Sequence, residues 1–133
     1  MSAFRDDKHV SDVLGGFFRE RALSEDPVFT QSGAIIAYTT KEPHVRIVLD
    51  ASKTPKPGTF FTVYVNDANA PAPNVELFMR ADTLDALLRG DMKPMELVAQ
   101  GRAKAEGDLS LAMRLMPAMV RNIPIYRKFR ETH

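Results

Sequence analysis

The sequence predicts an α+β protein in which helices cover one face of a single sheet. Three observations support this class: a helical pattern near the start, apolar strand-like runs over residues 33–80, and further helical patterns after residue 82. Strands joined mostly by short loops, with helices grouped after them, are typical of this architecture. At 133 residues, the chain is expected to form one domain, residues 1–133.

Residues 10–25 have the pattern of an amphipathic helix. Ser11 is expected to cap it, and Pro27 to end the segment. Gly15 and Gly16 make the helix less certain, because each glycine lowers helix stability by about 1 kcal/mol relative to alanine. The apolar side consists of Val10, Val13, Leu14, Phe17, Phe18 and Leu23.

Four strands are predicted next, at 33–40, 44–50, 59–66 and 75–80. The connecting loops are rich in Pro, Gly, Asn and Lys, which favour turns and solvent. Within the last three strands, the apolar residues that share a face are Val45, Ile47, Leu49, Phe61, Val63, Val65, Val75, Leu77 and Met79.

Two short helices are expected after the fourth strand. Asp82 or Thr83 is the predicted cap of the first, and Gly90 ends it. Pro94 begins the second helix, because proline is favoured in a first helical turn, and Gly101 ends it. The intervening glycines leave room for only short elements.

Residues 102–106 are the fifth predicted strand, with alanines on one face and charges on the other. A strand that buries only Ala103 and Ala105 leaves space beside it. Either a cavity occupies that space or a bulky neighbouring side chain reaches across it. The sequence leaves both alternatives open.

Asp108 is the expected cap of a final helix, on which Met113 and Met116 share an apolar face. Pro117 lies inside this pattern, and a proline within a helix costs about 3 kcal/mol. The helix is therefore expected to kink or end near Met116. Pro124 repeats the interruption, so residues 125–133 are predicted to be either a short helix or a loose tail.

The composition excludes several classes of function. The chain has no cysteine, so disulfides, thiolate metal sites and thiol nucleophiles are excluded. Its three histidines are far apart in sequence, and no common catalytic or nucleotide-binding motif is present. A net charge of +1 argues against a nucleic-acid partner. We expect no cofactor and no metal, and, without a signal sequence or membrane span, a cytoplasmic location.

The segment after Pro117 is basic, with aromatic and aliphatic residues between the charges. One interpretation is transient contact with a membrane surface, in which the apolar side chains meet lipid and the cations meet anionic head groups. The other, which we favour, is a final helix docked on the domain with a solvated basic face. The residues concerned are Arg121, Ile123, Ile125, Tyr126, Arg127, Lys128, Phe129 and Arg130.

Methionine is frequent for a chain of this length, with seven residues. Its unbranched side chain suits irregular core gaps, and also surfaces that repack around different apolar ligands. Filling of an ordinary core is the commoner role. Clustering on one helix beside the alanine strand favours a ligand cavity.

The spacing of glycine, proline and basic residues within residues 75–115 resembles that of the sterol carrier protein 2 family. That family shows a G-x-[ML]-[ND]-P turn, a Q-G-K-[LV]-K-[IV]-x-G-[DN] strand and an L-A-x-[KR]-L helix. The corresponding residues are Gly90, Met92, Pro94, Gln100, Gly101, Arg102, Lys104, Gly107, Asp108, Leu111, Ala112, Arg114 and Leu115. The ordered match covers residues 75–115, and the N-terminal half agrees only in the order of its elements.

The resemblance implies a five-stranded, mostly antiparallel sheet with an apolar tunnel between sheet and helices. It implies non-enzymatic binding, and transfer, of a sterol, fatty acid or fatty acyl-CoA. Gln100 would be the polar residue near the tunnel, and the C-terminal segment would cover its mouth. With periodicity added, the predicted lipid-binding residues are Phe61, Met79, Leu87, Leu88, Gln100, Ala103, Ala105, Met113, Met116 and Met119.

The chain departs from the family pattern at three places. Lys93 stands where Asn or Asp is usual, alanines replace Leu and Ile in the strand, and Pro117 interrupts the tail. The identity of the ligand therefore does not transfer. Two alternatives remain open: an enzyme or enzyme accessory that acts on or presents a hydrophobic metabolite, and a protein-interaction module with a filled core.

Overall fold

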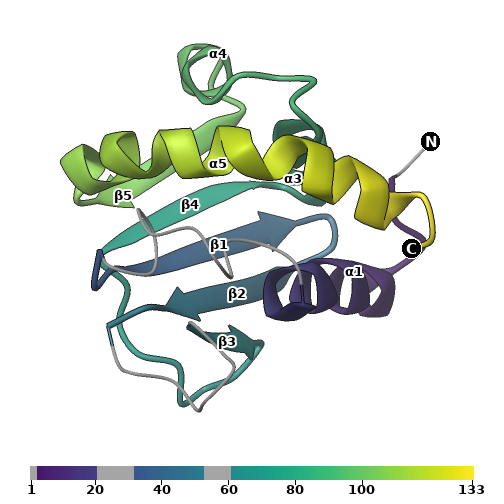
Figure 1. The fold of residues 1–133 in the computed structure, drawn as a ribbon, viewed down its shortest axis with the longest axis horizontal. Coiled ribbons are helices and arrows are strands. Elements are labelled where there is room, and N and C mark those ends of the chain that lie inside the picture. The colour runs from purple at the N-terminus through teal and green to yellow at the C-terminus, as the bar shows by residue number, and fades with distance from the viewer. Residues whose placement is uncertain (1–2, 21–31, 53–60) are drawn as a thin grey trace.

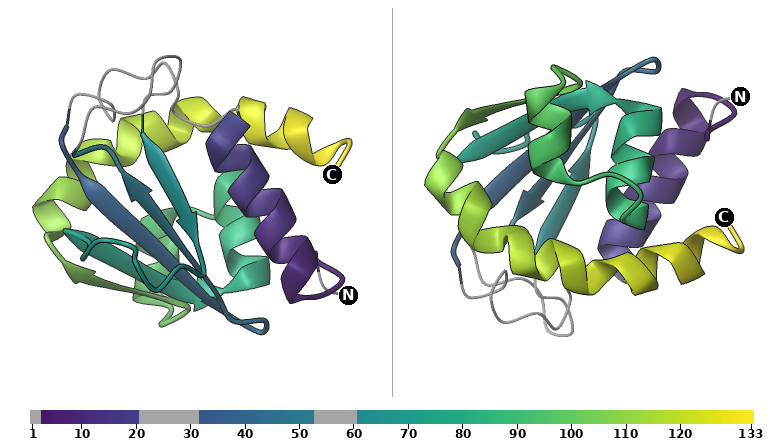
Figure 2. Two further views of the ribbon diagram at one scale, coloured as in Figure 1. Left: turned by 90° about the horizontal axis from the view of Figure 1, so that it is seen from below. Right: turned by 90° about the horizontal axis from the view of Figure 1, so that it is seen from above.

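The structure is a computed structural model that describes residues 3–20, 32–52 and 61–133. Its elements are α1 (Asp7–Glu20), β1 (Ile35–Lys41), β2 (Val45–Asp50), β3 (Thr62–Val65), β4 (Val75–Arg80), α3 (Ala81–Arg89), α4 (Pro94–Ala99), β5 (Ala103–Gly107) and α5 (Leu109–Arg130). Figure 1 shows α5 crossing the sheet, with α1 beside β2 and β3. Figure 2 shows α1 and α5 on the same side of the sheet. The predicted α+β class is confirmed.

The five strands form one sheet in the order β3-β2-β1-β4-β5. The β1–β4 pair is parallel and the other three pairs are antiparallel, so the sheet is mostly antiparallel, as the family resemblance implied. The chain returns to the sheet after α3 and α4, and β5 then pairs with β4 at one end of the strand order, where it forms an edge. Gly107 is essential at its end: φ is +101°, and a Cβ there would lie 2.3 Å from the Asn74 carbonyl oxygen.

The face of the sheet that carries the helices holds the core. The register places Tyr38 opposite Ile47, and Ile36 opposite Leu49, all four buried. The face assignments made for Val45, Ile47, Leu49, Val75 and Met79 are confirmed, since each of them is buried. On the other face, Arg46 donates two hydrogen bonds of 3.3 Å to the carboxylate of Glu76.

The first helix begins earlier than predicted. It starts at Asp7, where the Asp6 carboxylate accepts a hydrogen bond of 2.8 Å from the His9 backbone N–H. The prediction of Ser11 as the cap is wrong, because its hydroxyl lies inside the helix and donates to the Asp7 carbonyl. The predicted residues 21–25, and the first two residues of the predicted strand 59–66, lie outside the described residues.

The start of α3 also differs from the prediction. Neither Asp82 nor Thr83 is its cap, because the chain passes directly from β4 into the helix at Ala81. The Asp82 carboxylate instead accepts a hydrogen bond from the Ala3 backbone N–H at 2.9 Å. The predicted end at Gly90 is confirmed: φ is +79°, and Ile123 of α5 packs where a Cβ would be.

The last helix is continuous through both prolines. The Asp108 side chain caps it, as predicted, by accepting from the Leu111 N–H at 3.0 Å. The alternatives in which α5 ends near Met116, or the chain ends in a loose tail, are wrong, because Pro117 and Pro124 lie within α5. Figure 2 shows the axis of α5 change direction in its N-terminal half, which agrees with a proline kink. Buried side chains on both sides of Pro117 offset the lost hydrogen bond.

A buried charge cluster attaches the C-terminal half of α5 to α3. The carboxylate of Asp85, itself 5% exposed, accepts a hydrogen bond of 2.6 Å from the Tyr126 hydroxyl. Arg89 lies 2.7 Å and Arg130 3.2 Å from the same carboxylate. The Arg130 guanidinium also donates to the Ala3 carbonyl at 2.7 Å, so the cluster joins three segments of the chain.

We predict that Asp85→Ala lowers the free energy of unfolding by about 3 kcal/mol, because it leaves the buried guanidinium of Arg130 and the buried hydroxyl of Tyr126 without their partner. Urea denaturation measures the change. Glu42→Gln is the control, since it removes an exposed ion pair with Arg80 (2.8 Å) and should cost less than about 1 kcal/mol. Equal losses in the two variants would contradict the importance assigned to the cluster.

A second prediction concerns alkaline pH. Burial raises the pKa of Tyr38 to about 12. Between about pH 10, where an unfolded tyrosine releases its proton, and about pH 12, the folded protein retains it, so stability falls as pH rises. In Tyr38→Phe the free energy of unfolding should fall less steeply across this range, by about 1.4 kcal/mol per pH unit, because the variant lacks the titrating hydroxyl. Denaturation curves of both proteins across this range measure it, and parallel curves would contradict it.

Candidate functional site

A cavity of about 370 Å³ lies between the β4–β5 edge of the sheet and helices α3, α4 and α5. Every side chain that lines it within the described part of the chain is apolar. The lining residues are Leu77, Met79, Leu87, Pro94, Met95, Leu97, Val98, Ala103, Ala105, Leu109, Ala112, Met113, Met116 and Met119. Such a site can hold an apolar molecule, and its own lining offers no group for acid–base or nucleophilic chemistry.

The strand register explains why space remains there. Ala105 pairs with Leu77, and Ala103 pairs with Met79, so all four side chains point from one face of the sheet edge into the cavity. The exposed Lys104 and Glu106 point the other way and pair with each other at 2.9 Å. Of the two alternatives for the alanine strand, a cavity is therefore the one observed.

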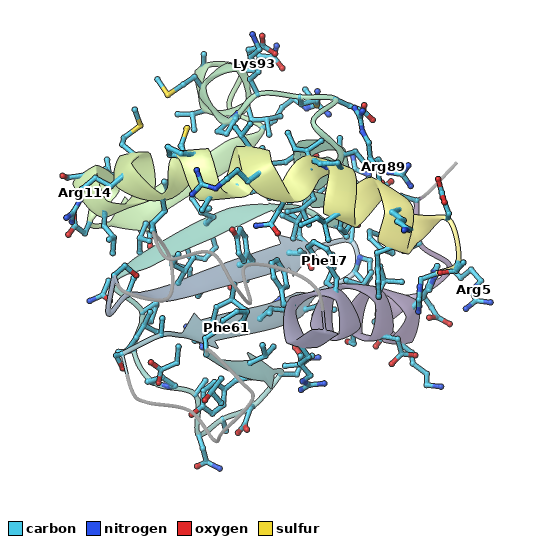
Figure 3. All side chains as sticks on the ribbon, viewed as in Figure 1. Arg5, Phe17, Phe61, Arg89, Lys93 and Arg114 are labelled. Atoms are coloured by element: carbon cyan, nitrogen blue, oxygen red, sulfur yellow. The ribbon has the colours of Figure 1, made fainter. Side chains whose placement is uncertain are left out.

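The helices supply the opposite wall. Along α5, the lining residues recur every three or four positions, which places them on one face of the helix. The neighbouring stripe of α5, which includes Leu115 and Ala118, is buried in the core. Figure 3 shows methionine sulfur atoms beside α4 and the N-terminal half of α5, while Lys93 and Arg114 point outward. One face of α5 therefore serves the core and the adjoining face serves the cavity.

The cavity opens between α4 and the start of α5. Four of its lining residues are more than half exposed: Met95 (61%), Val98 (51%), Leu109 (53%) and Met113 (54%). Large apolar side chains grouped in solvent are unusual and often mark a binding surface. Their position at the rim gives an apolar molecule a continuous apolar path from the surface.

A smaller cavity of about 30 Å³ continues inward under α5. It shares Leu77, Ala112 and Met119 with the main cavity. The remaining lining residues are Ile36, Tyr38, Val75, Leu115 and Ala118, of which only Tyr38 carries a polar group. The inner cavity thus lies beside the main one and has Tyr38 in its wall.

Seven of the ten predicted site residues lie together around the main cavity: Met79, Leu87, Ala103, Ala105, Met113, Met116 and Met119. Phe61 and Leu88 are instead buried in the core, and Gln100 is exposed at the C-terminal end of α4. None of these three lines the main cavity. The role of the seven in lipid binding stays a prediction.

Sequence reasoning missed several lining residues. Leu77 shares the strand face of Met79 and could have been chosen by the same alternation. Met95, Val98 and Leu109 belong to patterns read only as helix faces, and nothing in the sequence showed that they surround an opening. Tyr38 was missed because its strand is apolar on both faces.

The basic C-terminal segment is docked on the domain, which was the favoured interpretation. Tyr126 and Phe129 are buried, and the Arg127 side chain donates to the Arg89 carbonyl at 2.6 Å. Its aromatic side chains thus face the core. Among the described residues, no group of His, Asp and Glu is arranged to hold a metal ion, and no helix is long and apolar enough to cross a membrane.

Comparisons with solved structures show the same fold. The sterol carrier protein domain 2 of Helicoverpa armigera has a TM-score of 0.70 at 17% identity, covering 92% of this chain and 96% of that one. Sterol carrier protein 2 from Yarrowia lipolytica (apo form) has a TM-score of 0.57 at 16% identity, covering 86% and 85%. A ubiquinone synthesis protein, UbiJ-SCP2, has a TM-score of 0.56 at 14% identity, covering 85% and 91%.

No curated protein sequence matches this chain. The sequence model of one family does match it, over residues 18–120, which is most of its length. The match includes the whole sheet and the helices around the cavity, and its family is the one that the pattern at residues 75–115 resembles. The chain belongs to the SCP-2 sterol transfer family.

Proposed function

We propose that this protein binds a lipid or another mainly apolar small molecule in the cavity between β5, α4 and α5, and carries it between sites. The observation that supports this most directly is the cavity itself, about 370 Å³ and lined by apolar side chains from residues 77–119. Ligand pockets in proteins commonly measure about 300–1,000 Å³ and are lined mainly by apolar side chains. Family membership points to the same kind of ligand.

The physical basis of affinity is the removal of apolar surface from water. Burial contributes roughly 2.5 kcal/mol for every 100 Å² of apolar ligand surface. The unbranched side chains of Met113, Met116 and Met119 can adopt several rotamers, so the wall can adjust to ligands of different shape. Such a site favours a class of molecules over one particular member.

A second candidate is an accessory role, in which the protein presents a hydrophobic intermediate to an enzyme. The structural likeness to the ubiquinone synthesis protein UbiJ-SCP2 supports it. The open rim also supports it, because a bound molecule would be accessible from one side. The two roles differ in the molecule carried: a bulk lipid for transfer, or a pathway intermediate for presentation.

Met116→Asp should weaken the binding of a fluorescent fatty acid at least roughly tenfold, because a carboxylate in an apolar cavity loses its hydration without gaining a partner. Fluorescence titration measures the affinity. Val120→Asp is the matched control: it places the same charge on the same helix, at a side chain that is 63% exposed and outside the cavity lining. It should bind as the unmodified protein does.

Native mass spectrometry of protein purified gently from its own host distinguishes the two candidates. A mixture of common lipids supports transfer, and a single aromatic or prenylated metabolite supports presentation. If no molecule co-purifies and no amphiphile displaces the fluorescent fatty acid, the proposal of a ligand-binding function is wrong.

A further inference from the structure

Tyr38 is a buried polar side chain at the inner end of the cavity system. It lies on the helix-bearing face of β1 and is only 4% exposed. Its ring stacks on Phe18 of α1, with centroids 5.6 Å apart and planes inclined by 13°. Side chains in strands stand roughly perpendicular to the sheet, so the hydroxyl at the tip of the ring lies toward the helix layer.

Among the described residues, the Tyr38 hydroxyl makes no hydrogen bond, and its oxygen is not among the fully buried atoms that lack a partner; Tyr126, also buried, donates to Asp85 at 2.6 Å. Tyrosine hydroxyls inside a protein normally find a partner, because a polar group that loses most of its water without gaining a hydrogen bond lowers stability. The exception at Tyr38 coincides with the cavity that it lines. A partner supplied from the cavity would remove that cost.

Water is a poor candidate for that partner. The inner cavity, at about 30 Å³, has room for a water molecule. A buried water, however, needs about two to four polar partners, and Tyr38 is the only polar side chain among the described residues of the lining. An oxygen atom that belongs to an apolar ligand needs no further partners, because the rest of the molecule is held by apolar contact.

The two cavities are adjacent. Leu77, Ala112 and Met119 line both spaces, so only these side chains would have to move for one molecule to occupy both. Among the described residues, no cation lines either space, so a carboxylate or phosphate there would have no counter-charge from them. A tyrosine hydroxyl is protonated at neutral pH and can donate, and burial, which raises the pKa of Tyr38 to about 12, extends that state into the alkaline range.

We propose that Tyr38 determines specificity by hydrogen-bonding an uncharged oxygen, such as a hydroxyl, ketone or ester group, at the inner end of a ligand whose apolar body fills the main cavity. This inference rests on the proposed binding function and adds a direction to it: the oxygenated end lies inside and the hydrocarbon end lies toward the mouth. It selects neutral lipids over anions of the same chain length.

The test compares dodecanol, dodecane and dodecanoate as competitors of one fluorescent apolar probe, at about pH 8, where the acid is ionised. The unmodified protein should bind dodecanol more tightly than dodecanoate. Tyr38→Phe should weaken dodecanol roughly fivefold while changing dodecane less than about twofold, because only the alcohol loses a hydrogen bond.

Tyr64→Phe is the matched control, because it makes the same chemical change on β3, at a residue outside the lining of both cavities. It should leave all three affinities unchanged. If Tyr38→Phe changes dodecanol and dodecane equally or not at all, the inference is overturned, while the proposed binding function stands. If none of the competitors displaces the probe, both are overturned.

A spectroscopic measurement covers the case in which Tyr38→Phe does not fold. Dodecanol, but not dodecane, should shift the tyrosine absorption band of the unmodified protein, and Tyr64→Phe should retain the shift. Identical spectra with the two ligands would overturn the inference.

Discussion

The carboxylate of Asp85 holds the long helix on the domain. Tyr126, Arg89 and Arg130 converge on it, so the C-terminal half of α5 is fixed to α3 and, through Ala3, to the chain's start. The N-terminal half of α5 then extends over the β4–β5 edge without comparable polar attachment to the sheet. Because one half of the helix is fixed by buried charges and packed rings, the other half can border a cavity.

The cavity arises because the side chains of β5 and α5 are together too small to fill the space between them. The edge strand contributes only alanine to its inner face, while α5 contributes methionines that reach part of the way across. Neither wall belongs fully to the core, and the core itself is completed elsewhere, around Phe17, Tyr126 and Leu49. The space is thus compatible with a stable fold, because the residues that leave it empty are not those that hold the sheet and helices together.

Much of this architecture could be predicted from the sequence. Alternation in the strands, Gly90, Pro94, Gly101 and the Asp108 cap gave the elements close to their observed bounds, because each depends on local chemistry. The starts of α1 and α3 were less accurate: Asp6, four residues before the apolar stripe was taken to begin, caps α1 by a local hydrogen bond, and β4 runs directly into α3 without a side-chain cap. The continuity of α5 through Pro117 depends on packing along its whole length, and the place of Tyr38 in the wall of the inner cavity depends on which elements lie beside β1. Neither feature can be predicted from the local sequence alone.

The alanines of β5 have a consequence for how this protein can change over time. Ala103 and Ala105 face empty space and lie on an edge strand, so a larger side chain there would meet the cavity before it met the core. Under the proposed function, substitutions at these positions would change which ligands fit while leaving the fold in place. Single substitutions on an edge strand would then be enough to change ligand preference among relatives.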